Sequence, residues 1–172
     1  MYKILLSLLI FLMISDVYSF TSPALNGGSD IHFSDFRGKK ILIVNTASTG
    51  AMAGQYARLE QLYEQYRDSL VIVAFPSNDF GHEPGSEQAI QDSLQNLYHV
   101  QFPVASKTVV SGDGQCALFQ WLTQGSQNGV MNSTISNDFQ KYLIGSDGHL
   151  IGYFIGAMDP LDSTITNLIS GQ

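Results

Sequence analysis

The chain has 172 residues, of which 44% are hydrophobic and 13% are charged, and its formal net charge at pH 7 is −7. This composition supplies a sizeable core and excludes an intrinsically disordered chain, and the length is typical of a single domain. The acidic balance, without basic clusters, argues against nucleic acid as a partner and against an anionic membrane surface.

The first residues have the pattern of a secretory signal peptide. Lys3 precedes an apolar run over residues 4–14, and the residues that end at Ser19 fit a small-residue cleavage site. We therefore expect residues 1–19 to be a signal peptide, cleaved after Ser19, and the mature protein to be periplasmic or secreted without stable membrane insertion. An uncleaved anchor is the alternative, although the run is shorter than the about 20 residues that a span needs.

Residues 20–172 are expected to form one domain in which strands and helices alternate. After an irregular lead-in, residues 31–33 predict a short edge strand, and the continuous apolar run at residues 41–45 predicts a strand buried on both faces. Apolar residues at helical spacing predict a helix over residues 51–67, and a second buried strand follows at residues 70–75. This order defines a βαβ unit with a parallel strand pair.

The middle of the chain predicts a helix, a strand and a second helix. Ser86 is a suitable N-cap for a helix that continues to about residue 97. Residues 102–105 are expected to form a third short strand, and residues 116–122 a short helix. The polar residues 123–137 are expected to form a loop.

The last part of the chain predicts a hairpin and a final helix. The Asp147-Gly148 pair favours a tight turn between strands at residues 139–144 and 149–155. Asp159 as N-cap, with Pro160 at the first helical position, predicts the start of the last helix. The order of elements resembles the thioredoxin-like layout, an α/β fold with a central mixed β-sheet flanked by helices.

Five stretches of sequence resemble the glutathione peroxidase family in their order and nearly in their spacing. They are "FRGKKILIVNTAS", "QYARLEQLYEQYRD", "LVIVAFPSNDFG", "EPGSEQAI" and "DFQKYLIGSDGHLIG". On these motifs the chain is identified as a member of the family from about Phe33 to the C-terminus. The resemblance implies hydroperoxide reduction by a thiolate or selenolate at a helix N-terminus, with glutathione or thioredoxin as the reductant.

The resemblance also implies where that chemistry would take place, and all of those positions differ here. The family's chalcogen position corresponds to Gly50, its glutamine to His82, and its Trp-Asn pair to Asn137 and Asp138. The neighbouring Thr49 is no substitute, because a hydroxyl group has no reversible oxidised state. We therefore expect a pseudoenzyme without a cofactor, a non-catalytic binding protein for an unknown protein or small-molecule ligand.

The alternative hypothesis, an active antioxidant peroxidase, depends on Cys116. It is the only cysteine of the chain, and it lies at the start of a predicted helix, where the helix dipole favours a thiolate. The competing interpretation is that Cys116 is a small, buried hydrophobic residue.

A further alternative is an acid–base or metal site at His82. With Asp79 or Asp138, His82 would form an acid–base pair or a weak metal site, whereas a histidine on a loop is more commonly solvated. The closely spaced ligands of zinc sites are absent from the sequence, so no metal is predicted.

The resemblance also covers three short polar residues, which match the family's scaffold and not its catalytic positions. They are Asn45, Ser48 and Asn78. Short polar side chains of this kind hydrogen-bond to nearby backbone groups. We expect these three residues to tie loops together, a structural role that does not depend on catalysis.

Overall fold

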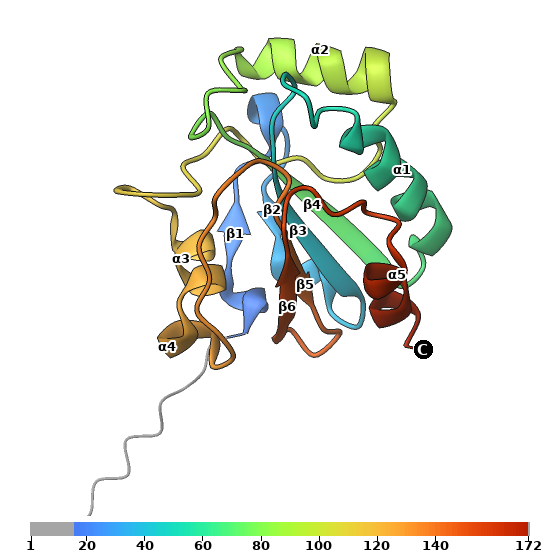
Figure 1. Ribbon diagram of the computed structural model, residues 1–172, viewed down its shortest axis with the longest axis vertical. Coiled ribbons are helices and arrows are strands. Elements are labelled where there is room, and N and C mark those ends of the chain that lie inside the picture. The colour runs from blue at the N-terminus through green and yellow to red at the C-terminus, as the bar shows by residue number, and fades with distance from the viewer. Residues whose placement is uncertain (1–15, 172) are drawn as a thin grey trace, which may run out of the picture.

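The computed structural model describes residues 16–171, so most of the predicted signal peptide lies outside the described residues. The centre of the molecule is a four-stranded sheet with the strand order β4-β3-β5-β6 (Figure 1). Its strands are β3 (Lys40–Thr46), β4 (Leu70–Pro76), β5 (Lys141–Ile144) and β6 (Leu150–Phe154). β3 runs parallel to β4 and antiparallel to β5, and β5 runs antiparallel to β6. The sheet is therefore mixed, as the sequence predicted.

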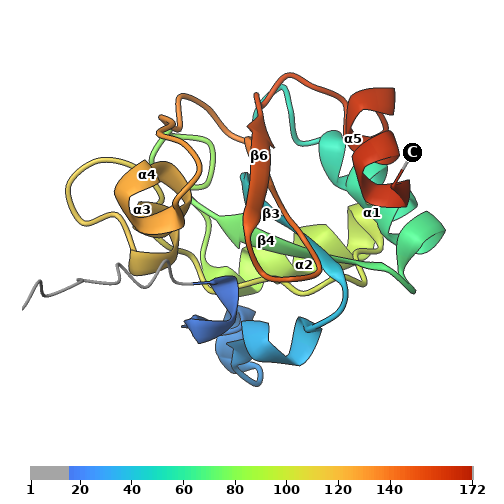
Figure 2. The same ribbon diagram turned by 90° about the horizontal axis from the view of Figure 1, so that it is seen from below.

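Helices cover both faces of this sheet (Figure 2). They are α1 (Gln55–Tyr66), α2 (Glu87–Tyr98), α3 (Ala117–Thr123), α4 (Gly125–Asn128) and α5 (Ser163–Ser170). Side chains alternate along β3, so Leu42 and Val44 pack with α1, α2 and α5, while Ile41 and Ile43 pack with α3 on the other face. The predicted thioredoxin-like α/β layout is confirmed.

The N-terminal segment forms a small structure of its own beside the main sheet. It comprises the 3-10 helix η1 (Val17–Ser19), β1 (Thr21–Ser22), η2 (Leu25–Gly27), β2 (Ile31–His32) and η3 (Phe33–Phe36). The strand predicted at residues 31–33 therefore forms, but it pairs with β1 in a separate two-stranded sheet and not at the edge of the main sheet.

Residues just before the predicted cleavage site pack into this domain. Val17 is completely buried, and its N–H group donates a hydrogen bond of 3.0 Å to the β5–β6 turn. Tyr18 is buried too, with the guanidinium of Arg37 lying 4.1 Å from the centre of its ring. A cut after Ser19 would remove both side chains, whereas a mature N-terminus at Asp16 or earlier keeps them. The position of the cut stays a prediction.

Two predicted elements differ in the middle of the chain. Residues 102–105 do not form a strand of the sheet, and only isolated bridges join Val104 to Ala74 and Ala105 to Ala24. Pro103 lies in this segment and has no N–H group to donate to a ladder. The polar segment 123–137 was expected to be loop throughout, but it contains the short helix α4.

Two helices begin later than predicted. α1 begins at Gln55 and not at residue 51, because residues 51–54 form turns before the helix. The prediction that Asp159 and Pro160 open the last helix is wrong. The Asp159 carboxylate accepts the N–H of Leu161 in a turn, and Asp162 is the actual N-cap of α5.

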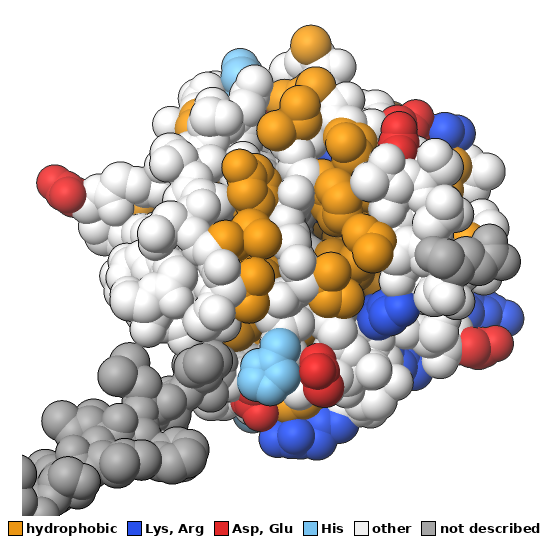
Figure 3. Space-filling view, turned by 60° about the horizontal axis from the view of Figure 1, so that its bottom comes forward, with side chains coloured by type: hydrophobic (Ala, Val, Ile, Leu, Met, Phe, Trp, Pro, Cys, Tyr) orange, Lys and Arg blue, Asp and Glu red, His pale blue; other side chains and the backbone are white. Residues whose placement is uncertain are grey.

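The surface carries both hydrophobic and charged side chains. Figure 3 shows hydrophobic side chains across the middle of one face of the molecule and charged side chains mainly toward its margins. Edge strand β6 and the residue after it contribute exposed Ile151, Tyr153 and Ile155. Within residues 16–171, no helix combines the length and the apolar character that crossing a membrane requires.

Candidate functional site

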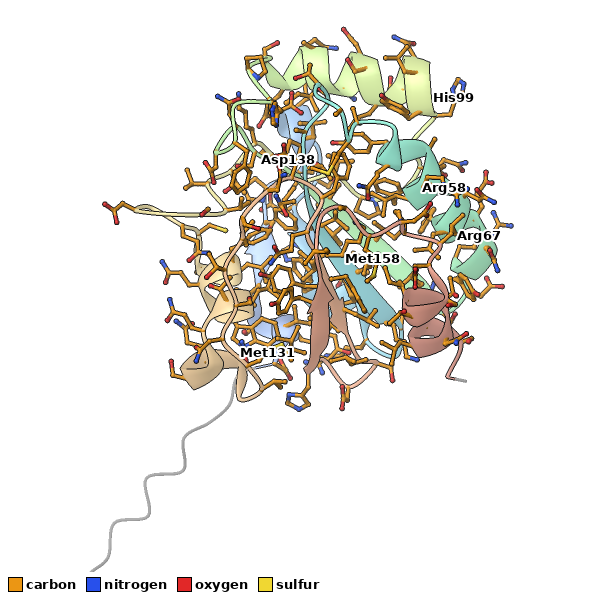
Figure 4. The ribbon with its side chains drawn as sticks, viewed as in Figure 1. Arg58, Arg67, His99, Met131, Asp138 and Met158 are labelled. Atoms are coloured by element: carbon orange, nitrogen blue, oxygen red, sulfur yellow. The ribbon has the colours of Figure 1, made fainter. Side chains whose placement is uncertain are left out.

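The four positions singled out by the sequence converge on one pocket. Gly50 lies in the turn between β3 and α1, and His82 in the loop between β4 and α2. Asn137 and Asp138 belong to the segment that leads into β5, and Figure 4 shows Asp138 near the end of the sheet where that segment lies. The pocket has a volume of about 230 Å³ and is lined by Thr49, Gly50, Ala51, Met52, His82, Asn137 and Asp138.

Gly50 has a backbone conformation that residues with a side chain rarely adopt. Its φ is +87°, in the left-handed region that glycine enters without steric cost. A Cβ atom at this position would lie 3.1 Å from Cγ of His82 and 3.3 Å from Cδ2 of the same ring. The imidazole of His82 therefore occupies the space that a side chain at position 50 would enter.

His82 is held by Asp138. Nδ1 of His82 lies 2.6 Å from Oδ2 of Asp138, whose side chain is only 3% exposed, while that of His82 is 47% exposed. The sequence left Asp79 and Asp138 open as partners, and the structure selects Asp138. Asp79 instead accepts the N–H groups of Val110 and Ser111 at 2.7 and 2.9 Å.

A second set of hydrogen bonds fixes the loops around the pocket. The fully buried carboxylate of Glu83 accepts the N–H of Ser48 at 2.5 Å and its hydroxyl at 2.6 Å. Oδ1 of Asn78 accepts the N–H of Glu83 at 2.9 Å, and Nδ2 of Asn45 donates to the carbonyl of Asn137 at 3.0 Å. The predicted structural role of Asn45, Ser48 and Asn78 is therefore confirmed.

The His82 loop is also tied directly to the Gly50 turn. The N–H of Thr49 donates to the carbonyl oxygen of His82 at 3.2 Å, and the Thr49 hydroxyl donates to the same oxygen. Together with the bonds of Glu83 to Ser48, these contacts fix the two loops against each other.

Tyr56 lies in the interior near the site. Its side chain is completely buried, and burial raises the pKa of its hydroxyl far above the ordinary value. The negative charges of Glu83 and Asp138 raise this pKa further. Tyr56 therefore remains neutral and places no charge under the pocket.

Lys141 is a buried amine that sequence reasoning missed. Its Nζ donates to Oε1 of Gln55 at 2.8 Å and to the carbonyl oxygens of Phe139 and Gly156 at 2.7 and 3.2 Å. Burial lowers its pKa to about 7, and the charge of Asp159 partly opposes this shift. Alternation along β5 was the available signal, because it puts Lys141 on the same face as the core residue Leu143.

Cys116 lies apart from this pocket. It is the N-cap residue of α3, is half-buried, and packs against the core cluster on that face of the sheet. The cavity that it lines, of about 200 Å³, shares no residue with the pocket around Gly50. The structure thus places the only thiol outside the site that the sequence motifs define.

The described part of the chain does not support a metal site at His82. Across residues 16–171, no group of three or more histidine, cysteine, aspartate or glutamate side chains is arranged to hold a metal ion. His82 and Asp138 pair with each other, which makes the acid–base alternative the one that the geometry fits.

Comparisons with known proteins agree with the fold and the motifs. A sequence profile of the family described as glutathione peroxidase matches residues 17–123. The chain is 37% identical over 142 residues to the glutathione peroxidase-like peroxiredoxin gpx1 of Schizosaccharomyces pombe, covering 81% of this chain and 89% of that protein. It is 38% identical over 131 residues to the glutathione peroxidase homolog BsaA of Staphylococcus epidermidis, covering 75% of this chain and 82% of that protein.

Solved structures give the same result. The crystal structure of Trgpx in its apo form matches with a TM-score of 0.69 and 28% sequence identity, covering 91% of this chain and 95% of that chain. The protein described here belongs to the glutathione peroxidase family and has a thioredoxin-like fold. Its relatives support a peroxidase-type function at the level of the family.

Proposed function

We propose that this protein is an exported member of the family that has lost thiol peroxidase chemistry and binds a ligand in the pocket around Gly50. One observation carries the proposal: the position that aligns with the family's chalcogen is a glycine with φ of +87°, and the ring of His82 fills the space above it. The peroxidase cycle needs a sulfur or selenium atom that is oxidised and then reduced. Position 50 offers neither atom.

The pocket itself supports a binding role. Its loops are cross-linked by the buried Glu83 and by Asn45, so the pocket is held in shape although position 50 carries no side chain. Its volume of about 230 Å³ suits a small molecule or a short protruding group of a protein partner. With 15 acidic against 8 basic residues, the chain is a poor match for nucleic acid.

A peroxide-consumption assay tests the proposal. Purified protein is mixed with hydrogen peroxide or an organic hydroperoxide and with either glutathione and its reductase or thioredoxin and its reductase, and oxidation of NADPH is followed. An active family member in the same buffer is the positive control. We expect the rate with this protein to equal the rate without it, whereas a rate that rises in proportion to its concentration would overturn the proposal.

The second candidate function is a peroxidase that works through Cys116. The observation in its favour is that this thiol is half-buried rather than sealed in the core, and that Lys107 lines the same cavity. This candidate predicts that peroxide converts Cys116 to a sulfenic acid, which a dimedone-type reagent traps and mass spectrometry detects. It also predicts that Cys116→Ala removes all peroxide turnover.

A further inference from the structure

The pairing of His82 with Asp138 fixes which nitrogen of the imidazole faces outward as a base. An ionised carboxylate only accepts hydrogen bonds, so the short contact of 2.6 Å places the ring proton on Nδ1. In the neutral ring, Nε2 then carries the lone pair. Because the His82 side chain is 47% exposed and lines the pocket, this lone pair is accessible to a molecule bound there.

Three residues that line the same pocket have backbone N–H groups that donate to no acceptor within the described residues. They are Gly50, Ala51 and Met52, which precede α1 and whose N–H groups make no hydrogen bond to another group among residues 16–171. The α1 dipole adds positive potential at this end of the helix. An oxygen atom that becomes negative during a reaction would be stabilised by such groups.

The nearby protein hydroxyls are directed elsewhere. The Ser48 hydroxyl donates to Glu83, and the Thr49 hydroxyl donates to the carbonyl oxygen of His82. Neither proton is directed at the imidazole nitrogen. A base at His82 therefore acts on water or on a bound molecule and not on a serine or threonine nucleophile of the chain.

From these features we propose that His82 is the general base of a hydrolytic site for short carboxylic esters. Its Nε2 takes a proton from a water molecule while the water oxygen bonds to the ester carbonyl carbon, and the carbonyl electron pair moves onto its oxygen. The N–H groups at Gly50, Ala51 and Met52 stabilise that oxyanion. The C–O bond then breaks, the alcohol leaves with the proton from Nε2, and a carboxylic acid remains.

Five of the seven lining residues have a part in this reaction. His82 is the catalytic residue, and Asp138 is a positioning residue that keeps the proton on Nδ1. The side chains of Ala51 and Met52 give the acyl group an apolar wall, and the volume of about 230 Å³ restricts the substrate to short acyl chains. The inference goes beyond the proposed function, since it adds turnover without redox chemistry to binding at the same pocket.

Hydrolysis of p-nitrophenyl acetate by the whole mature chain tests the proposal, with release of p-nitrophenol measured for wild type, His82→Gln and His149→Gln. His149 is an exposed histidine in the β5–β6 turn and controls for the background reactivity of surface imidazoles. We expect His82→Gln to lower the protein-dependent rate about tenfold or more, and His149→Gln to leave it unchanged. A His82→Gln rate within about twofold of wild type, or a wild-type rate no higher than that of equimolar free imidazole, would overturn the proposal.

Asp138→Asn tests the positioning role separately. The asparagine amide can donate to Nδ1, which moves the ring proton to Nε2 and removes the lone pair from the pocket. We expect kcat to fall about tenfold or more with KM unchanged and with the circular dichroism spectrum of wild type. An unchanged kcat would remove Asp138 from the mechanism. No step of ester hydrolysis involves peroxide, so the two proposals are tested separately. Absence of ester hydrolysis would not contradict the proposed loss of peroxidase chemistry, and peroxide turnover would not contradict ester hydrolysis.

Discussion

Substituting Gly50→Cys introduces a thiol at the position that the sequence motifs align with the family's chalcogen, and we expect it to destabilise the fold without giving peroxidase activity. A non-glycine residue in the left-handed region costs about 1–2 kcal/mol. The new Cβ would lie 3.1 Å from Cγ of His82, so the ring must move and its bond to the buried Asp138 carboxylate is weakened. Leaving a buried acceptor unpaired costs about 1–3 kcal/mol.

Together these costs predict a loss of about 2–5 kcal/mol, which for a domain of this size lowers the Tm by about 4–20 °C. Thermal unfolding followed by circular dichroism measures the shift, and the coupled peroxide assay measures the activity. Gly54→Cys is the matched control, because Gly54 has a helical φ of −58° and a Cβ there meets nothing within 4 Å. We expect that variant to melt close to wild type.

Adding His82→Ala to Gly50→Cys separates the two costs. Removing the ring relieves the collision but not the backbone strain, so the loss in the double variant should be smaller than the sum of the two single losses. The reasoning is refuted if Gly50→Cys melts with wild type, or if the two substitutions are strictly additive. Peroxide turnover by Gly50→Cys alone would show that His82, Asn137 and Asp138 do not prevent the chemistry.

Two further predictions concern the N-terminal segment and the buried amine. Because Val17 and Tyr18 are buried, we expect the mature protein to begin at Asp16 or earlier, and an intact-mass measurement that places its first residue at Phe20 would contradict this. Burial holds the pKa of Lys141 at about 7, below its ordinary value of 10.5, so the unfolded chain binds more protons than the native chain between these two values. The free energy of unfolding of wild type should therefore rise, relative to that of Lys141→Met, as the pH increases from about 7 to 10.5. Urea titrations at several pH values measure both free energies. If the two free energies change with pH in parallel, the pKa of Lys141 is not depressed.

Strong local patterns were enough to predict much of the fold. The apolar runs at residues 41–45 and 70–75 became β3 and β4, and Ser86 caps α2 as expected. The prediction failed where two local signals competed. Asp159 and Asp162 are both good caps, and the helix begins after the second, with Ile165 and Ile169 packed in the core.

The site could be predicted only in part. The resemblance named Gly50, His82, Asn137 and Asp138, and the structure brings them to one pocket. The choice of Asp138 over Asp79 could not come from the sequence, because it depends on where the β4–α2 loop meets the segment before β5. The collision between a side chain at position 50 and the His82 ring is equally a matter of distances, which no motif records.

The most direct test of the central claim is the steady-state loss of hydroperoxide with purified wild-type protein, measured once with glutathione and once with thioredoxin as the reductant. The absence of a thiol or selenol at position 50 predicts a slope identical to that of the protein-free control. A slope proportional to protein concentration would contradict the account, and its disappearance in Cys116→Ala would identify the thiol responsible.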